Sequence, residues 1–271
     1  MEMKNKYKVF FGLQKDPFAP DVDVKDILST PQLQAAVQRF EYSIQIGAVY
    51  LITGEIGSGK STAIRYLLNR LHPSEYKTIY VTAGTGSIME LYRLIVATLD
   101  LQPTGMSRAL MSGRIKNQVL DLVNGKKKKM VLVIDEASLL RLEVFAELHT
   151  LCQFEMDCKP YLPLILAGQS NLLDKLIYPA SLPLASRVVA KSHFTGTDLE
   201  QMQAYLQHHL RIAGIKHMLF DETAVTAIQQ GSGGIFRKAN HLARGALVAA
   251  AMGKSKTVNA EHVRTAASEI F

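Results

Sequence analysis

The strongest indication of the fold lies in residues 48–62, Ala48-Val49-Tyr50-Leu51-Ile52-Thr53-Gly54-Glu55-Ile56-Gly57-Ser58-Gly59-Lys60-Ser61-Thr62. An apolar run typical of a buried strand leads directly into Gly-x-x-x-x-Gly-Lys-Ser, the pattern of a phosphate-binding loop. Glycines let the backbone curl so that its N–H groups converge on phosphates, and the N-terminus of the next helix adds partial positive charge. The sequence therefore predicts a nucleotide site made by Gly54, Glu55, Ile56, Gly57, Ser58, Gly59, Lys60, Ser61 and Thr62.

Two residues of this loop have specific roles in the predicted chemistry. Lys60 is expected to reach the β- and γ-phosphates, because an ammonium group on a flexible stem suits that position. Ser61 is expected to place its hydroxyl on Mg²⁺, a cation that prefers oxygen ligands. The expected cofactors are therefore ATP and Mg²⁺.

A second element bears on hydrolysis of the nucleotide. Residues 129–137, Lys-Met-Val-Leu-Val-Ile-Asp-Glu-Ala, read as a buried parallel strand that ends in two carboxylates. Asp135 is expected to hold Mg²⁺ through water, and Glu136 to orient and polarise the attacking water. Two acids after a strand are also a common helix cap. Beside the phosphate loop, the pair favours a Mg²⁺-dependent ATPase.

Composition indicates a protein of a reducing compartment. The 271 residues contain two cysteines, Cys152 and Cys158, whose spacing matches no zinc or redox motif, so two reduced thiols are expected. No apolar run approaches the length of a membrane span, and residues 1–8 are polar and charged without a signal-peptide core. We expect a cytoplasmic protein with no membrane association.

The charge balance favours an anionic partner. Lys and Arg number 31 against 24 Asp and Glu, which gives a net charge of +7 and a pI near 9.3. The densest basic cluster is Lys126-Lys127-Lys128-Lys129. A lysine run before a buried strand is more often a solvated loop than a DNA contact, and both interpretations stay open.

Strand and helix patterns alternate up to about residue 196. The apolar strand patterns lie at 48–53, 78–82, 130–134, 162–167 and 188–194. Helical periods lie at 31–46, 60–71, 87–99, 107–124, 140–155 and 171–177. Such alternation predicts an α/β fold in which a parallel sheet lies between helices.

After Gly196 only helical patterns remain, at 198–213, 221–230, 235–252 and 259–270. Thr197-Asp198 and Asp221-Glu222 have the composition of helix starts. We therefore expect two domains, a nucleotide-binding core at 1–196 with an N-terminal segment at 1–30, and a small all-helical lid at 197–271.

With both motifs in this arrangement, the chain resembles the AAA+ ATPases, and in particular the ExeA/GspA-type group. The resemblance covers nearly the whole chain. Besides the phosphate loop and the Asp135-Glu136 pair, it rests on Tyr7, Phe10–Leu13, Pro17-Phe18, Phe154–Asp157, Leu164–Gln169, Leu184–Arg187, Leu210–Gly214 and Gly234–Asn240.

The resemblance implies roles for three polar residues. Gln169, or its neighbour Ser170, would be the sensor that contacts the γ-phosphate or the attacking water. Arg187 would be an arginine finger given to the nucleotide of a neighbouring subunit, and Arg237 a second sensor in the lid. Either arginine could instead form an ordinary surface ion pair. Phe236 stands where the family usually has proline before Arg237.

The N-terminal aromatic residues have two alternative roles. By resemblance, Phe10-Phe11 and Phe18 would pack beside the adenine. Packing within an apolar core is an equal alternative.

The resemblance splits into two functional classes. Secretion-associated ExeA/GspA members look like this core followed by a membrane segment and a peptidoglycan-binding domain. A chain that ends at Phe271 is more similar to stand-alone transposition ATPases of the MuB, TnsC and IstB type. The latter implies an ATP-dependent regulator that assembles head to tail as a ring or filament on double-stranded DNA and recruits or activates a DDE transposase. An envelope or secretion partner, or a defence or signalling NTPase, remains the alternative.

A target selector needs sequence-nonspecific contacts to the DNA backbone, which Ser, Thr and Arg side chains supply. Residues of these types gather after the second strand and could equally cap helices. The predicted DNA-binding set is Thr85, Ser87, Thr104, Ser107, Arg108, Arg114 and Lys116.

Overall fold

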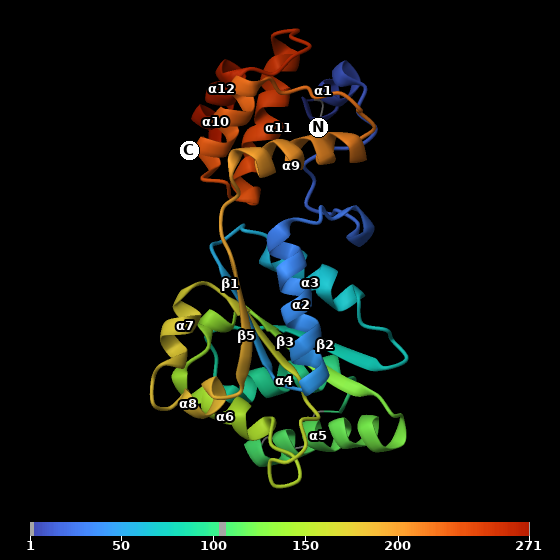
Figure 1. The fold of residues 1–271 in the computed structure, drawn as a ribbon, viewed down its shortest axis with the longest axis vertical. Helices are drawn as coiled ribbons and strands as arrows, with labels where there is room; N and C mark the ends of the chain where they lie inside the picture. Colours follow the sequence, from blue (N-terminus) through green and yellow to red (C-terminus); the bar gives the residue numbers. More distant parts are fainter. Residues whose placement is uncertain (1–2, 103–106, 271) are drawn as a thin grey trace. The chain divides into compact units, whose positions relative to one another are not determined.

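The computed structural model describes residues 3–102 and 107–270. The chain divides into two compact units (Figure 1). We call residues 31–54 and 60–194 the sheet unit, and residues 3–30, 55–59 and 195–270 the helical unit.

The sheet unit is built on five parallel strands. They are β1 (Val49–Gly54), β2 (Tyr76–Thr82), β3 (Lys129–Asp135), β4 (Leu164–Gly168) and β5 (Val188–Phe194), in the order β2-β3-β4-β1-β5. The central strands β1 and β4 are buried along their whole length, whereas the edge strands β2 and β5 are buried only in part. This confirms the predicted parallel α/β sheet, because strands covered on both faces read as continuous apolar runs.

Helices cover both faces of this sheet (Figure 1). On one face, α2 (Pro31–Ile46) and α3 (Lys60–Asn69) pack against β1, with the rings of Phe40 and Tyr50 6.3 Å apart. The other face carries the larger apolar core, to which Leu51, Leu132 and Leu166 point. The helices of that core are α4 (Ile88–Thr98), α5 (Arg108–Leu120), α6 (Leu142–Leu151), α7 (Asn171–Leu176) and α8 (Leu182–Ala185).

Several predicted boundaries in this unit differ from the structure. The predicted helix 107–124 changes at Asp121 to a π-helical turn that ends at Gly125. The predicted helix 140–155 ends at Leu151, before a segment of left-handed backbone. Strand β4 begins at Leu164, because Pro163 has no N–H for the sheet and only its carbonyl accepts, from Leu132 N at 3.0 Å.

The helical unit consists of α1 (Met3–Phe11), α9 (Leu199–Ile212), α10 (Glu222–Ser232), α11 (Phe236–Met252) and α12 (Ala260–Ile270). Asp198 and Asp221 cap α9 and α10, accepting from Gln201 N and Ala224 N at 2.8 Å each. These bonds satisfy backbone donors that a helix start leaves free. The predicted C-terminal run of helices is therefore present.

The N-terminal segment packs with these C-terminal helices, whereas the predicted domain division places residues 1–30 with the core. Helix α1 was not predicted; its Tyr7 and Phe11 are buried in the same apolar cluster as α9, α10 and α11. Phe18 is 1% exposed and stacks on His209 with ring centroids 5.8 Å apart. These contacts correspond to the core-packing alternative for the N-terminal aromatic residues.

Within residues 3–102 and 107–270, none of the helices is both long and apolar enough to cross a lipid bilayer. Cys152 is buried and Cys158 exposed, and both are free thiols.

Gly47, which follows α2, provides a test of the sheet unit's packing. Its φ is +71°, and a Cβ added there would lie 2.1 Å from the Pro160 carbonyl oxygen. We expect Gly47→Ala to lower the free energy of unfolding by about 2–4 kcal/mol, through the left-handed backbone and the clash. In the matched control Gly113→Ala, on α5, a Cβ meets nothing within 4 Å. That change should raise stability by about 0.5–1 kcal/mol. Equal shifts in denaturant melts would contradict the assigned packing.

Candidate active site

Three predicted site segments lie at the same edge of the sheet. The phosphate loop follows β1, Asp135 ends β3, and Gln169 follows β4. Strand β4 pairs with β1 on one side and with β3 on the other, all parallel. Parallel strands present their carboxyl ends at one edge, which is where ligands bind in open α/β sheets. The strand order therefore brings Gly54, Asp135 and Gln169 to one edge of the sheet unit.

The phosphate loop has the backbone that its glycines allow. Gly57 and Gly59 have φ of +86° and +100°, values that residues with a side chain rarely adopt. Lys60, the first residue of α3, is 7% exposed and its Nζ donates to the Gly54 carbonyl at 3.0 Å. Within the described residues, the buried Ser58 hydroxyl oxygen has no hydrogen-bond partner. A buried lysine and an unsatisfied hydroxyl in a curled glycine loop fit a phosphate ligand.

Ser61 and Asp135, the two predicted magnesium ligands, contact each other. Ser61 Oγ donates to Asp135 Oδ2 at 3.2 Å, and the Glu136 backbone N–H donates to Asp135 Oδ1 at 2.9 Å. Asp135 is 4% exposed. A hydroxyl and a carboxylate in contact are ligands that Mg²⁺ accepts while keeping several waters. The residues present therefore fit the predicted cation.

Tyr80 is a site residue that sequence reasoning missed. Its Oη, on β2, donates to Asp135 Oδ2 at 2.7 Å. The pKa of Tyr80 is raised to about 12, mainly because the ring is buried and secondly because its hydroxyl donates a hydrogen bond to Asp135. The phenol therefore stays protonated and donating at neutral pH. The feature that could have revealed this contact is the strand register. Thr82 pairs with Asp135, and Tyr80 lies two residues earlier on the same face of the sheet.

Glu136 is held in a strained conformation. Its φ of +54° and ψ of +30° lie in the left-handed region, which costs a residue with a side chain about 1–2 kcal/mol. Such outliers persist where the surroundings impose them, often at active sites. The next turn is fixed to β4, because the Gln169 backbone N–H donates to Ser138 Oγ at 3.3 Å. Gln169 and Glu136 thus lie in segments that contact each other.

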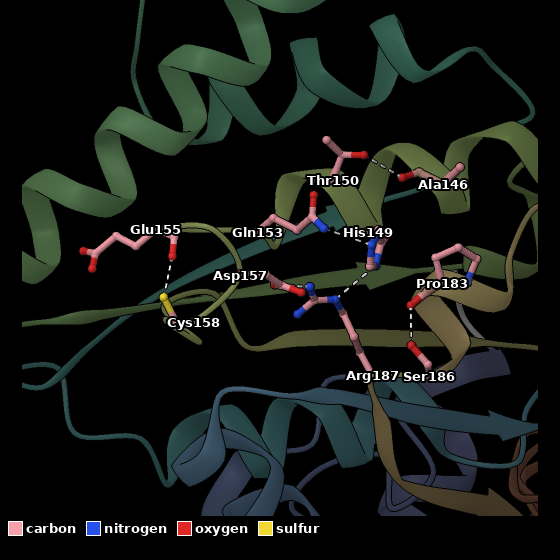
Figure 2. Close-up of polar contacts among 10 residues, drawn as sticks. All are labelled: Ala146, His149, Thr150, Gln153, Glu155, Asp157, Cys158, Pro183, Ser186 and Arg187. Carbon is pink, nitrogen blue, oxygen red and sulfur yellow. Dashed lines mark hydrogen bonds and ion pairs between the residues drawn. The ribbon is translucent and has the colours of Figure 1, made fainter.

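Arg187 lies at the opposite edge of the sheet. It precedes β5, and its carbonyl accepts from Val49 N, at the start of β1, at 3.0 Å. Strand β1 has six residues, so about 20 Å of strand separates this position from the phosphate loop. The Arg187 guanidinium bonds to His149 and Asp157 (Figure 2). In this subunit, Arg187 is therefore not among the residues gathered at the carboxyl edge.

Arg237 lies in the first turn of α11, in the helical unit. Its backbone N–H donates to the Gly57 carbonyl at 3.2 Å, and its Cβ would meet a Cβ at Gly57 at 2.6 Å. Phe236 begins α11 and packs on Tyr205 with centroids 4.5 Å apart. At a first helical position proline is favoured but not required, so phenylalanine leaves the helix start in place.

Most of the predicted DNA-binding residues make contacts within the sheet unit. Ser107 Oγ accepts from Leu110 N at 3.3 Å as the cap of α5, the alternative role considered for it. Arg108 pairs with Glu147 at 2.7 Å. The other contacts are those of Arg114 with the Gln102 carbonyl, Lys116 with the Phe154 ring and the Thr85 carbonyl with Arg141. Ser87 precedes α4 without a side-chain cap bond, and Thr104 lies outside the described residues.

The lysine run lies beside a hollow at the amino edge of the sheet. The hollow has a volume of about 430 Å³ and is lined by Lys77, Lys126 and Lys128, with Tyr76 and the π-helical residue Leu122 among its walls. Lys128 Nζ donates to the Pro73 carbonyl at 2.8 Å. The run therefore adds basic groups to this edge of the sheet.

Comparison with known proteins agrees with this geometry. Residues 46–176 match the family described as "AAA domain" (AAA_22). The matched range contains the phosphate loop, the Asp135-Glu136 pair and Gln169.

A curated relative is the general secretion pathway protein A of Aeromonas hydrophila, 31% identical over 269 residues. The match covers 97% of this chain and 48% of that protein, so the chain spans about half the length of its relative. This match does not show the resemblance to stand-alone transposition ATPases.

Two solved structures share the fold. Cdc6p from Pyrobaculum aerophilum has a TM-score of 0.75 at 16% identity, covering 96% of this chain and 72% of that one. The ORC1 protein of Aeropyrum pernix, determined in complex with DNA, has a TM-score of 0.70 at 20% identity, covering 94% and 68%. At these identities the likeness concerns the fold alone.

Tyr80→Phe tests the magnesium assignment. It removes a donor to Asp135 and keeps the ring, so we expect the Mg²⁺ concentration for half-maximal ATP turnover to rise about tenfold. Tyr76→Phe, on the same strand, is the matched control and should leave the Mg²⁺ midpoint unchanged. Equal midpoints for the two variants would show that the Tyr80 hydrogen bond does not matter to the cation.

Proposed function

We propose that this chain is a Mg²⁺-dependent ATPase that acts with further copies of itself on double-stranded DNA and regulates DNA transposition. The observation that carries the ATPase part is the strand order. It brings the phosphate loop, Asp135-Glu136 and Gln169 to one edge of the sheet.

The residues at this edge have distinct tasks in the reaction. Lys60 and the loop N–H groups would bind and orient the β- and γ-phosphates, and Ser61 and Asp135 would hold Mg²⁺, which when bound would offset negative charge on the phosphates. Glu136 orients the attacking water, and Gln169 contacts the water or the γ-phosphate. Arg237 belongs to the helical unit and contacts the loop through its backbone N–H, which supports a role in sensing nucleotide state.

Arg187 supports the self-assembly part of the proposal. Its position about one strand length from its own phosphate loop suits contact with the nucleotide of another copy. Such a contact joins two different surfaces, and head-to-tail contacts of this kind build rings or open filaments. A guanidinium offered across this contact would stabilise charge on the departing phosphoryl group.

The DNA part rests on charge and likeness. The net charge is +7, and one protein that shares the fold was solved in complex with DNA. Recruitment or activation of a DDE transposase, in the cytoplasm, rests on the similarity of the sequence to stand-alone transposition ATPases. Backbone contacts insensitive to sequence would suit the choice of many target sites.

A secretion ATPase is the second candidate. The 31% identity to the general secretion pathway protein A favours it. In that case, the same nucleotide cycle would act on an envelope or secretion protein, and DNA would not bind in any nucleotide state.

Mixing two inactive variants tests whether Arg187 acts between subunits. Lys60→Ala removes nucleotide binding but keeps Arg187. Arg187→Ala keeps a working phosphate loop but removes the arginine. At equal mixing, about a quarter of the contacts pair a working loop with an intact Arg187, so roughly a quarter of wild-type turnover is expected. Turnover that stays at the level of the separate variants at every mixing ratio would contradict action in trans.

Co-sedimentation with duplex DNA separates the two candidates. Glu136→Gln with ATP should bind DNA at least as well as the wild type, because ATP is retained, and Lys60→Ala should not bind. Binding should weaken steeply as salt rises and vary little with sequence. Absence of binding with ATP, a slowly hydrolysed analogue and ADP alike would favour the secretion candidate.

The same assay tests the predicted DNA surface. Replacing Arg108, Arg114 and Lys116 by alanine should weaken binding and reduce its salt dependence, because three phosphate contacts are lost. The matched control replaces Lys126, Lys127 and Lys128. If only the control weakens binding, the DNA surface is the lysine edge and the predicted set is wrong.

A further inference from the structure

We propose that His149 and Asp157 are positioning residues for Arg187, and that a neutral His149 ring is required for Arg187 to serve a neighbouring subunit's nucleotide. The inference rests on the proposed role of Arg187. It adds two residues, His149 and Asp157, that lie outside the phosphate loop and the Asp135-Glu136 pair.

Three separate segments of the sheet unit meet at the Arg187 guanidinium (Figure 2). Arg187 Nε donates to His149 Nδ1, on α6, at 3.0 Å. Arg187 Nη2 donates to Asp157 Oδ1, in the loop after α6. The Arg187 side chain is 22% exposed and that of Asp157 45% exposed. Two bonds to a planar group fix its orientation, so the long arginine side chain is held in one direction.

The remaining donors of this guanidinium are available for another acceptor. Nη1 makes no hydrogen bond to any of the described residues. A guanidinium carries five N–H groups in a rigid fork that matches phosphate oxygens. Holding Nε and Nη2 from within the subunit therefore leaves Nη1 for an anion that a second copy presents at the surface.

The loop that carries Asp157 is strained. Glu155, Met156 and Asp157 have φ of +47°, +55° and +70°, three successive left-handed residues. Each costs about 1–2 kcal/mol in a residue with a side chain. Met156 is 99% exposed, so packing of its side chain does not account for this conformation. The conformation does, however, bring the Asp157 carboxylate to Arg187.

The loop is secured at its other end. Tyr161 Oη donates to Glu155 Oε1 at 3.0 Å, and Cys158 N donates to the Glu155 carbonyl at 3.3 Å. Strain that is maintained by surrounding bonds is typical of functional positions. The loop is therefore built to hold one carboxylate in place.

His149 must be neutral for its bond to Arg187. Nδ1 accepts from Nε of Arg187, so the ring proton of the neutral imidazole is on Nε2. A proton on Nδ1 would remove the acceptor and place two cations side by side. Arg187 would then lose one of its two fixed contacts.

The groups around the ring act on its titration in opposite directions. Burial is the largest cause that lowers the pKa of His149, and the positive charge of Arg187 is the second. Asp157 and the Pro183 carbonyl raise that pKa, but by less. Burial raises the pKa of the neighbouring Cys152 thiol to about 12, so that group is neutral here. The net lowering keeps His149 neutral at pH 7. The contact with Arg187 is therefore intact at neutral pH and is lost as pH falls below the ordinary histidine value.

The test measures ATP turnover at saturating Mg²⁺ and ATP between pH 5 and 8. The variants are His149→Ala, His149→Asn, Asp157→Asn and Arg187→Ala, each confirmed as folded by circular dichroism. The control Glu41→Gln removes the carboxylate from a different arginine pair of the same unit, Arg70–Glu41 at 2.7 Å.

His149→Ala and Asp157→Asn should each lower kcat for ATP hydrolysis. They should leave KM for ATP unchanged, since a subunit binds ATP through its own phosphate loop. We expect about a tenfold fall in kcat for His149→Ala and for Asp157→Asn. In the wild type, turnover should fall at acidic pH as His149 is protonated. His149→Asn should restore turnover relative to His149→Ala and remove this acidic fall, because the asparagine carbonyl oxygen accepts from Arg187 Nε and does not titrate. Lys60→Ala subunits, which carry an intact Arg187 site, should rescue His149→Ala on mixing. Glu41→Gln should match the wild type.

The outcomes separate this inference from the proposed function. If Arg187→Ala abolishes turnover while His149→Ala and Asp157→Asn match the wild type in kcat and pH profile, the positioning roles are overturned and the trans arginine stands. An acidic limb that persists in His149→Asn overturns the histidine requirement. Full turnover by Arg187→Ala overturns the proposed role of Arg187 itself, and the inference with it.

Discussion

The parallel pairing of β3, β4 and β1 is the constraint on which the rest of the site depends. In a parallel sheet all strands end at the same edge, so the segments that leave neighbouring strands lie beside one another there. Thr53 pairs with Gly168 and Ile134 with Leu166, which brings Gly54, Asp135 and Gln169 to that edge from three distant parts of the sequence. The nearly complete burial of these strands makes this register costly to change, because a slip exposes apolar side chains.

The same geometry separates two kinds of chemistry. The residues predicted to bind phosphate and Mg²⁺ lie at the carboxyl edge, while Arg187 and the lysine run lie at the amino edge. A rigid sheet keeps these edges about one strand length apart. The proposed head-to-tail contact between copies follows from this separation, because Arg187 lies about one strand length from its own phosphate loop.

Both edges use strained backbone to hold a carboxylate. At the carboxyl edge Glu136 is left-handed, and at the amino edge so is the segment that ends at Asp157. Regular secondary structure places Cβ atoms only in certain directions, and a left-handed residue directs the chain elsewhere. The cost is offset by the apolar side chains that the sheet between the two edges buries.

The phosphate loop, the acidic strand end and the α/β alternation could be predicted from the sequence, because these depend on residue types at fixed local spacing. All five strands were predicted within a few residues, since buried parallel strands are continuous apolar runs. Local spacing carries no information on which distant groups meet. Folding of the chain is what joins Tyr80 to Asp135, Asp157 and His149 to Arg187, and the N-terminal residues to the C-terminal helices. Each of these contacts joins segments far apart in the chain, and their meeting is set by strand order, register and side-chain packing.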